Sequence, residues 1–259
     1  MRTMNLTELS NKITNAPDLD FGNIFGEAFE LFKKTWGEGI LMLLLSTILV
    51  IPAVLILYIP IFAAAASGIP ESSIEAGNLS PWYMITFGLL FLPVMALVQT
   101  IVLGLTAGYY RVVKEKDLGL GSGQANMFMF LKKEYLGKLF LLSIMSLGIA
   151  LLAVILCYLP VFYVAVPIGL IPIILAFNPE LTAKEILKAS FKLGNKKWVL
   201  LFGLIIVSYL LSSIVGMLLC GIGILFTSSF VYLPYYLVYK HSVGFEETDK
   251  ISQIEATEI

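Results

Sequence analysis

The sequence predicts an all-α fold: a polytopic membrane bundle of six transmembrane helices with amphipathic interfacial helices on its cytoplasmic side. Three observations predict it. The chain has 259 residues, of which 58% are hydrophobic and 14% charged, whereas soluble domains are about 45–50% apolar and about 25% charged. No Asp, Glu, Lys or Arg occurs in four long stretches, 39–70, 76–110, 139–179 and 198–239. The 17 Lys and Arg residues gather in the short segments between and beyond those stretches.

The lengths of the charge-free stretches set the number of crossings. The first two stretches, of 32 and 35 residues, each fit one crossing of about 20 residues. The other two would form helices of about 60 Å, twice the thickness of the bilayer core, so each must fold back once. Pro160 within 158–162 and the glycines within 219–223 mark the expected turns. The expected spans are near 40–60, 83–110, 139–157, 161–177, 198–219 and 224–240.

The basic residues indicate the orientation. With six spans and the N-terminus inside, every Lys and Arg is cytoplasmic, as the positive-inside rule requires, and only Glu71 and Glu75 lie outside. Residues 1–19 form a polar cytoplasmic segment without the apolar core of a signal peptide. Residues 20–240 form the membrane domain, and 241–259 an acidic, disordered cytoplasmic tail. We expect a multi-pass protein of the bacterial cytoplasmic (inner) membrane with both termini cytoplasmic.

Each internal segment contains an amphipathic stretch that runs into a span. Asp20 is an expected N-cap for the first, residues 127–135 form a weaker second stripe, and Thr182-Ala-Lys-Glu185 has the form of a capping box. A dibasic pair ends each stretch, and an aromatic residue follows it closely. The pairs are Lys33-Lys34, Lys132-Lys133 and Lys196-Lys197. Such lysines either contact anionic lipid headgroups or serve only to fix the topology.

Polar uncharged residues lie within the spans. They include a candidate intramembrane cluster of Gln99, Ser208, Ser212, Ser213 and Tyr232. These side chains either form structural hydrogen bonds between helices or line a path for a substrate. The spacing Gly104-x-x-x-Gly108 permits close approach of another helix.

The residues of catalytic and metal sites are scarce. His241 is the one histidine, and it follows the last expected span as a solvated flanking residue. Cys157 and Cys220 both fall near outer span ends, where they form a disulfide or simply pack as small apolar residues. We expect no catalytic, cofactor-binding or metal-binding residue, and no enzyme activity. The net charge of −1 gives no indication of nucleic-acid binding.

Three segments resemble an uncharacterised family of bacterial six-span membrane proteins. They are Gly104-Leu-Thr-Ala-Gly-Tyr-Tyr-Arg111 with the 127–136 helix, Glu185-Ile-Leu-Lys-Ala-Ser190 with Lys196-Lys197-Trp198, and Gly221-Ile-Gly-Ile-Leu-Phe-Thr227 with Pro234 and Tyr239. This family includes the membrane domain attached to some glycerophosphoryl diester phosphodiesterases. The resemblance implies a helical bundle in the bacterial cytoplasmic membrane. It does not imply the esterase reaction, because that chemistry belongs to a separate soluble barrel and no family catalytic residue has a matching position here.

The expected function is non-catalytic. We expect a scaffold or accessory subunit that packs against membrane lipids and a membrane-protein partner or a second copy of itself. The alternative is a conduit or carrier for a small or lipid-like molecule, using the polar faces of the second, fifth and sixth spans. A carrier coupled to an ion would need an ionisable group at membrane depth, and the charge-free stretches contain none.

Overall fold

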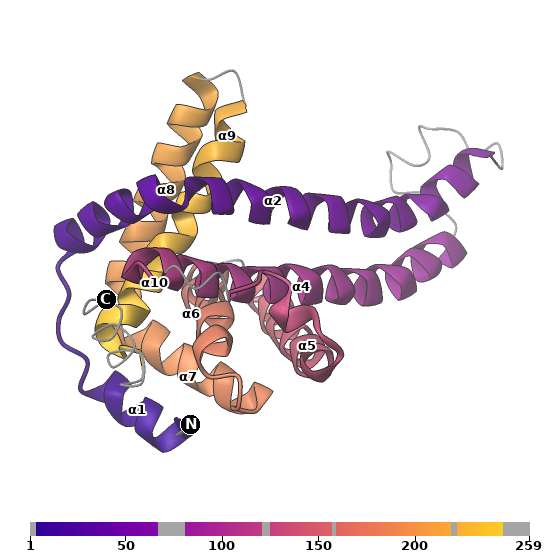
Figure 1. The fold of residues 1–259 in the computed structure, drawn as a ribbon. Coiled ribbons are helices and arrows are strands. Elements are labelled where there is room, and N and C mark those ends of the chain that lie inside the picture. The colour runs from indigo at the N-terminus through magenta and orange to yellow at the C-terminus, as the bar shows by residue number, and fades with distance from the viewer. Residues whose placement is uncertain (1–3, 67–80, 121–124, 157–158, 219–221, 246–259) are drawn as a thin grey trace.

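The structure is a computed structural model that describes residues 4–66, 81–120, 125–156, 159–218 and 222–245. The described residues form helices joined by short turns (Figure 1). The elements are α1 (Leu6–Thr14), α2 (Phe21–Ala66), α4 (Pro81–Leu118), η1 (Met129–Leu131), α5 (Lys133–Ile155), α6 (Leu159–Phe177), α7 (Ala183–Lys196), α8 (Trp198–Leu218), α9 (Ile222–Thr227), η2 (Ser228–Val231) and α10 (Tyr232–Ser242). The all-α class is therefore confirmed.

Five helices of the described chain are long and apolar enough to cross a membrane. They are Phe21–Ile56 of α2, Gly88–Leu118 of α4, and the whole of α5, α6 and α8. The expectation of a multi-pass membrane protein is confirmed at this level, whereas the count of six is not. The expected sixth span is divided into α9, η2 and α10. Pro234 contributes to this division, because it lacks the N–H that would continue the hydrogen-bond ladder to residue 230.

The two expected fold-back points coincide with helix ends. α5 ends at Ile155 and α6 begins at Leu159, next to Pro160. α8 ends at Leu218 and α9 begins at Ile222. The first amphipathic stretch and the first span, by contrast, are one helix of 46 residues. The charged side chains of 20–34 lie on one face of that helix and do not interrupt its backbone hydrogen bonds.

The N-terminal segment contains a helix that the sequence analysis missed. In α1 the side chains of Leu9 and Ile13 are fully buried. Its start is a capping box in which the Glu8 N–H donates to Asn5 Oδ1 at 2.9 Å and the Asn5 N–H donates to the Glu8 carboxylate at 3.3 Å. The signal was present as Asn5-x-x-Glu8 followed by two apolar residues four positions apart.

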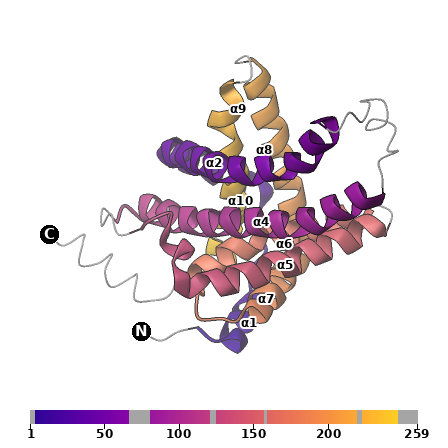
Figure 2. The same cartoon turned by 90° about the vertical axis from the view of Figure 1, so that its right-hand side faces the viewer.

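The α2–α4 pair and the α8–α9 pair form hairpins that point in different directions. α2 and α4 run side by side with α5 next to α4, while α8 and α9 cross the first part of α2 at a steep angle and extend beyond it (Figures 1 and 2). The expected bundle of six spans is therefore not confirmed. Both hairpins expose apolar side chains, such as Leu55 at 60% and Met217 at 82%. Such surfaces are costly in water and favourable in lipid.

α7 lies along α6 and packs its apolar face inside the protein. Its apolar stripe, Ile186, Ala189 and Leu193, is buried. A Cβ on Gly194 would meet Pro167 Cγ at 2.9 Å, which shows how closely the two helices approach. The structure therefore does not confirm α7 as an interfacial helix, because its apolar stripe contacts protein.

Candidate functional site

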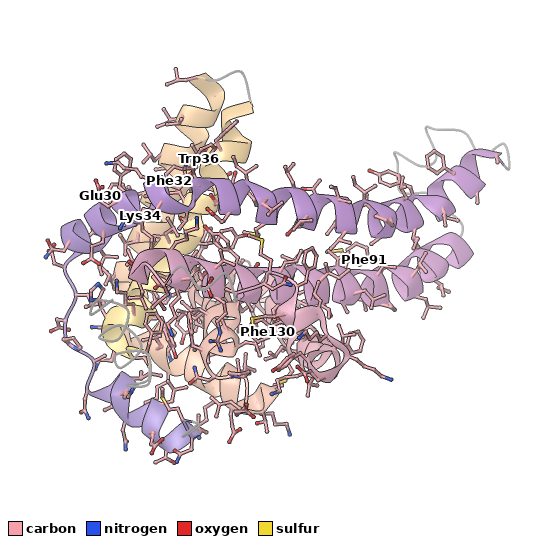
Figure 3. The ribbon with its side chains drawn as sticks, in the orientation of Figure 1. Glu30, Phe32, Lys34, Trp36, Phe91 and Phe130 are labelled. Carbon is pink, nitrogen blue, oxygen red and sulfur yellow. The ribbon has the colours of Figure 1, made fainter. Side chains whose placement is uncertain are left out.

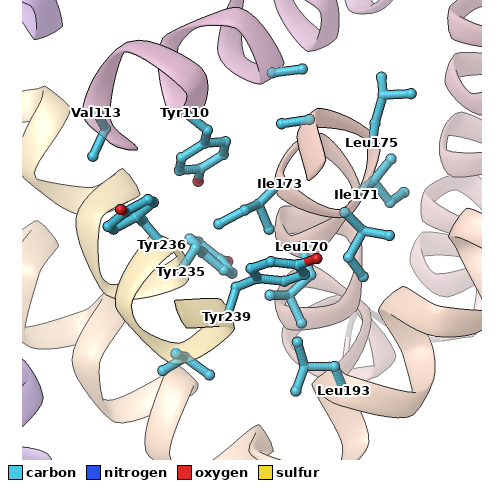
Figure 4. Packing of buried hydrophobic residues seen from close by; sticks show 14 of the residues in the cluster. Tyr110, Val113, Leu170, Ile171, Ile173, Leu175, Leu193, Tyr235, Tyr236 and Tyr239 are labelled. Atoms are coloured by element: carbon cyan, nitrogen blue, oxygen red, sulfur yellow. The ribbon is translucent and has the colours of Figure 1, made fainter. Parts of the chain in front are cut away.

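A buried tyrosine-rich core joins the ends of α4, α6 and α10 (Figure 4). Tyr110 of α4 donates its hydroxyl to the Tyr232 carbonyl at 3.2 Å. Asn178 Nδ2, just after α6, donates to the hydroxyl of Tyr239 at 2.8 Å. A Cβ on Gly169 of α6 would overlap the ring and hydroxyl of Tyr235. These contacts fix the three helices to one another. In the sequence, the adjacent tyrosines at 109–110 and 235–236 were the feature that pointed to this core.

The sequence analysis missed a partly buried ion pair beside this core. Asp117 at the end of α4 accepts from the Tyr236 hydroxyl at 2.9 Å and from Lys240 Nζ at 2.6 Å. The side chain of Asp117 is 14% exposed and that of Lys240 is 27% exposed. Spacing along the chain could not reveal this pair, because the two residues are 123 positions apart. The contact ties α10 to α4 and is structural, since both charged partners are satisfied within the protein.

The cations of α4 are also held by the protein. Arg111 Nε donates to the Ala176 carbonyl at 2.6 Å, and its guanidinium lies 5.3 Å from the centre of the Phe177 ring. Lys114 Nζ lies over the rings of Phe177 and Phe245, at 5.7 Å and 4.6 Å. These cation–π contacts fasten the last described residues of the chain to α4 and α6.

The predicted lipid-contacting lysines occupy different environments. Lys132 and Lys133 are exposed next to η1. On α2, Lys34 is exposed and Lys33 pairs with Glu30 at 2.6 Å (Figure 3). Their contact with lipid stays a prediction.

The pair Lys196-Lys197 at the end of α7 holds the N-terminal segment. Lys196 Nζ donates to the Thr14 carbonyl at the end of α1. Lys197 Nζ donates to the Pro17 carbonyl and lies 3.5 Å from Asp18 Oδ1. Lys192, one turn earlier, donates to the Ser10 carbonyl at 3.0 Å. With its side chain only 5% exposed, Lys197 has little surface for a headgroup, whereas Lys196 is exposed.

The predicted polar cluster is not one cluster in the structure. Gln99 lies on α4, which packs against α2, α5 and α6, whereas Ser208, Ser212 and Ser213 lie on α8, which packs mainly against α9 and η2. Tyr232 lies beside Tyr109, with ring centres 6.2 Å apart. In the structure α8 and α4 run in different directions (Figures 1 and 2). The sequence pattern does not show the direction of a helix, so it could not reveal this separation.

Two pairs of hydroxyl residues join neighbouring helices. Ser212 of α8 donates to the Thr227 carbonyl at 2.8 Å, and the Thr227 hydroxyl lies 3.0 Å from the Ser212 carbonyl. The hydroxyl oxygen of Thr100 in α4 lies 3.2 Å from the hydroxyl oxygen of Ser143 in α5. These bonds link helices directly, which is the structural role that the sequence analysis considered for polar residues in the spans.

Gly104 and Gly108 permit a close approach, as their spacing predicted. The segment that approaches most closely is the η1 region, and Leu139 of α5 also lies close to Gly104. A Cβ on Gly104 would meet Leu131 Cδ2 at 2.5 Å, and a Cβ on Gly108 would overlap the Met127 carbonyl. The pair therefore anchors the α4–α5 connection to α4.

The described residues contain no group of three or more His, Cys, Asp or Glu side chains that could hold a metal ion. His241 Nε2 lies 2.8 Å from Glu27 Oε2, so it joins α10 to α2 instead of extending freely into solvent. Cys157 and Cys220, together with Glu71 and Glu75, lie outside the described residues.

No family model matches the sequence, and neither a curated protein nor a solved structure is significantly similar to the chain. The resemblance to bacterial six-span proteins therefore stays a prediction.

Proposed function

We propose that this chain is a non-catalytic scaffold or accessory subunit of the bacterial cytoplasmic membrane, related to the six-span family it resembles. In this proposal both termini are cytoplasmic, and α9, η2 and α10 together form the sixth crossing. Ile222–Ser242 covers 21 residues, enough for about 30 Å of helix. The partners are membrane lipids and a membrane protein, either another chain or a second copy.

The exposed apolar surface of the α2–α4 hairpin carries the proposal. Only 11% of the most apolar window of α2 is buried within the chain. Ile48, Leu55, Ile59 and Phe62 are each at least 58% exposed. The described residues of the chain cover little of this surface, so lipid or a partner helix must cover it. The tightly packed core at the other end of the hairpin holds the surface in place.

A conduit or carrier has less support. Its expected polar path required Gln99 and the α8 serines to lie together, and they lie on helices that diverge. Ser212 is already hydrogen-bonded to the Thr227 carbonyl. The carrier remains the second hypothesis, and the polar faces give it no continuous lining among the described residues.

Co-purification with surface variants tests the scaffold. The full chain is extracted from native membranes in mild detergent, and its companions are quantified by mass spectrometry. We expect a membrane protein to co-purify with the chain at fixed stoichiometry. In the double variant Leu55→Ala/Phe62→Ala its recovery should fall at least about fivefold, equivalent to about 1 kcal/mol of binding free energy. Ile155→Ala, at an exposed position of α5, is the matched control. Absence of both a stoichiometric companion and a stable oligomer of the chain itself, or equal recovery from all variants, contradicts the scaffold.

A further inference from the structure

A groove opens where α7 ends and α8 begins. It has a volume of about 440 Å³. One wall comes from the connection between α1 and α2 and includes Asp18, Asp20 and Phe21. The other comes from the α7–α8 junction and includes Lys196, Lys197 and Trp198. Carboxylates and lysine side chains therefore line the same groove.

The charged groups of the groove still have hydrogen-bond donors and acceptors that could contact a ligand. The Asp18 side chain is fully exposed, although Lys197 Nζ is 3.5 Å from it. Asp20 accepts from the Asn23 N–H at 2.9 Å through Oδ1, and a carboxylate has a second oxygen and further lone pairs. Lys196 is exposed and donates one hydrogen bond to the Thr14 carbonyl. Because an ammonium group has three N–H donors, two remain for a ligand.

The groove also lies where the apolar surface of α8 starts. Val199 is 80% exposed. Trp198 stacks on Phe202 with ring centres 4.6 Å apart, and its indole N–H donates to the Tyr163 carbonyl at 3.1 Å. Tryptophan at the end of an apolar helix is typical of the headgroup layer. A lipid whose headgroup lies in the groove therefore has an apolar path for its acyl chains along α8.

We propose that this groove binds a phospholipid with a phosphoethanolamine headgroup, its phosphate against Lys196 and its ammonium between Asp18 and Asp20. The inference rests on the proposed membrane location. A purely anionic headgroup would meet the two carboxylates and be repelled. A choline headgroup presents no N–H to them, because its nitrogen carries four carbon substituents, so it forms no charge-assisted hydrogen bond.

Lipid retention tests the assignment. The full chain is reconstituted in vesicles that contain equal amounts of phosphatidylethanolamine, phosphatidylglycerol and phosphatidylcholine. It is then extracted from the vesicles, and the lipid bound to it is measured by native mass spectrometry. We expect enrichment of phosphatidylethanolamine and a loss of about fivefold in that enrichment for Lys196→Gln, the effect of one juxtamembrane charge. Asp20→Asn should have a similar effect while keeping an oxygen that caps α2.

The control is Lys184→Gln, an exposed lysine at the opposite end of α7 from the groove, which should leave the enrichment unchanged. Free O-phosphoethanolamine should displace the lipid better than inorganic phosphate, and equal displacement would mean that only phosphate is recognised, which overturns the proposal. Equal retention of the three lipids, or no response to either groove variant, also overturns it. Carbonate extraction separates the two proposals. A chain that stays in the membrane without lipid preference contradicts the groove alone, whereas a chain that leaves the membrane contradicts the proposed function too.

Discussion

Gly108 marks the point of closest approach between α4 and the segment that follows it. A methyl group there would overlap the Met127 carbonyl, a backbone atom that cannot rotate away. We expect Gly108→Ala to lower the free energy of unfolding by about 1–3 kcal/mol, the usual cost of overpacking. The measurement is thermal or denaturant-induced unfolding in detergent.

Gly88 in the same helix is the matched control. A Cβ at Gly88 has no heavy atom within 4 Å. Gly88→Ala should therefore be neutral or stabilising by up to about 1 kcal/mol, because alanine favours helix. Equal losses in the two variants would contradict the close approach.

Glu185 gives the start of α7 a dependence on pH. The Thr182 N–H donates to the Glu185 carboxylate at 2.9 Å and the Thr182 hydroxyl donates to it at 2.8 Å. These bonds to the charged form lower the pKa of the Glu185 carboxyl, the backbone bond most. Because the folded pKa is the lower one, this stabilisation is complete above the ordinary carboxyl pKa and is lost as pH falls through the lowered pKa.

The expected result is selective fraying of α7 at acidic pH. Amide hydrogen exchange at Ala183–Glu185 should accelerate on acidification, beyond the change of the intrinsic rate. In Thr182→Ala the same amides should exchange faster at neutral pH and show less of this acid-induced change. An acid response of equal size in the variant would rule out the capping box as its cause.

At the scale of elements, α1 depends on α7 for its stability. A helix of nine residues is marginal alone, but Leu9 is fully buried and the lysines of α7 hold the carbonyls near its end. Leu9→Ala should destabilise the docked helix by about 2–5 kcal/mol. Hydrogen exchange of α1 should rise while that of α4 stays unchanged.

Lys12→Ala supplies the comparison for this helix. Lys12 lies on the exposed face of α1, so its removal should change the exchange of α1 little. Protection of α1 that survives Leu9→Ala would show that α1 is not held through its apolar face.

The α8–α9 hairpin depends on the paired hydroxyl residues Ser212 and Thr227. Thr227→Val removes the Thr227 hydroxyl, which also lies 2.9 Å from the Gly223 carbonyl, and nearly keeps the side-chain shape. We expect a loss of about 0.6–1.7 kcal/mol, the range measured for hydrogen bonds between membrane helices. Ser213→Ala, at the half-exposed neighbouring position, should cost less in the same unfolding measurement.

The predictable parts of the fold are those set by local pattern. Charge-free runs located α6 and α8 to within two residues, because length and hydropathy suffice to define an apolar helix. α4 continues to Leu118 and α5 already begins at Lys133, because both helices extend into the charged segments beside the expected spans. The capping box of Thr182 and Glu185 was also confirmed, because its partners are three residues apart.

Contacts between distant segments were not predictable in this way. The Asp117–Lys240 pair, the packing of α7 along α6 and the separation of Gln99 from Ser208 depend on which helices meet. Helical periodicity shows that one face of a helix is apolar, but it does not show whether lipid or another part of the protein covers that face. The sequence analysis therefore placed the stripe of α7 at the membrane surface, whereas the protein buries it.

At the scale of the whole molecule, a packed core anchors two apolar hairpins. The tyrosines of α4 and α10, the buried half of α6, and α7 with α1 form that core, and the exposed apolar side chains lie on the hairpins. This division supports a protein whose core organises surfaces for lipid and partner helices. In the proposed function, lipid surrounds the hairpins while the lysine-bearing segments share one aqueous side.

Single-cysteine labelling tests that claim most directly. In a Cys157→Ser/Cys220→Ser background, cysteines replace Leu55, Met217, Lys132 and Lys188 in turn, and a membrane-impermeant maleimide is applied to right-side-out and inverted vesicles. Labelling of positions 132 and 188 from the cytoplasmic side only, with positions 55 and 217 unreactive, is the predicted result. Labelling of 132 and 188 from opposite sides, or ready aqueous labelling of 55 and 217, would contradict the account.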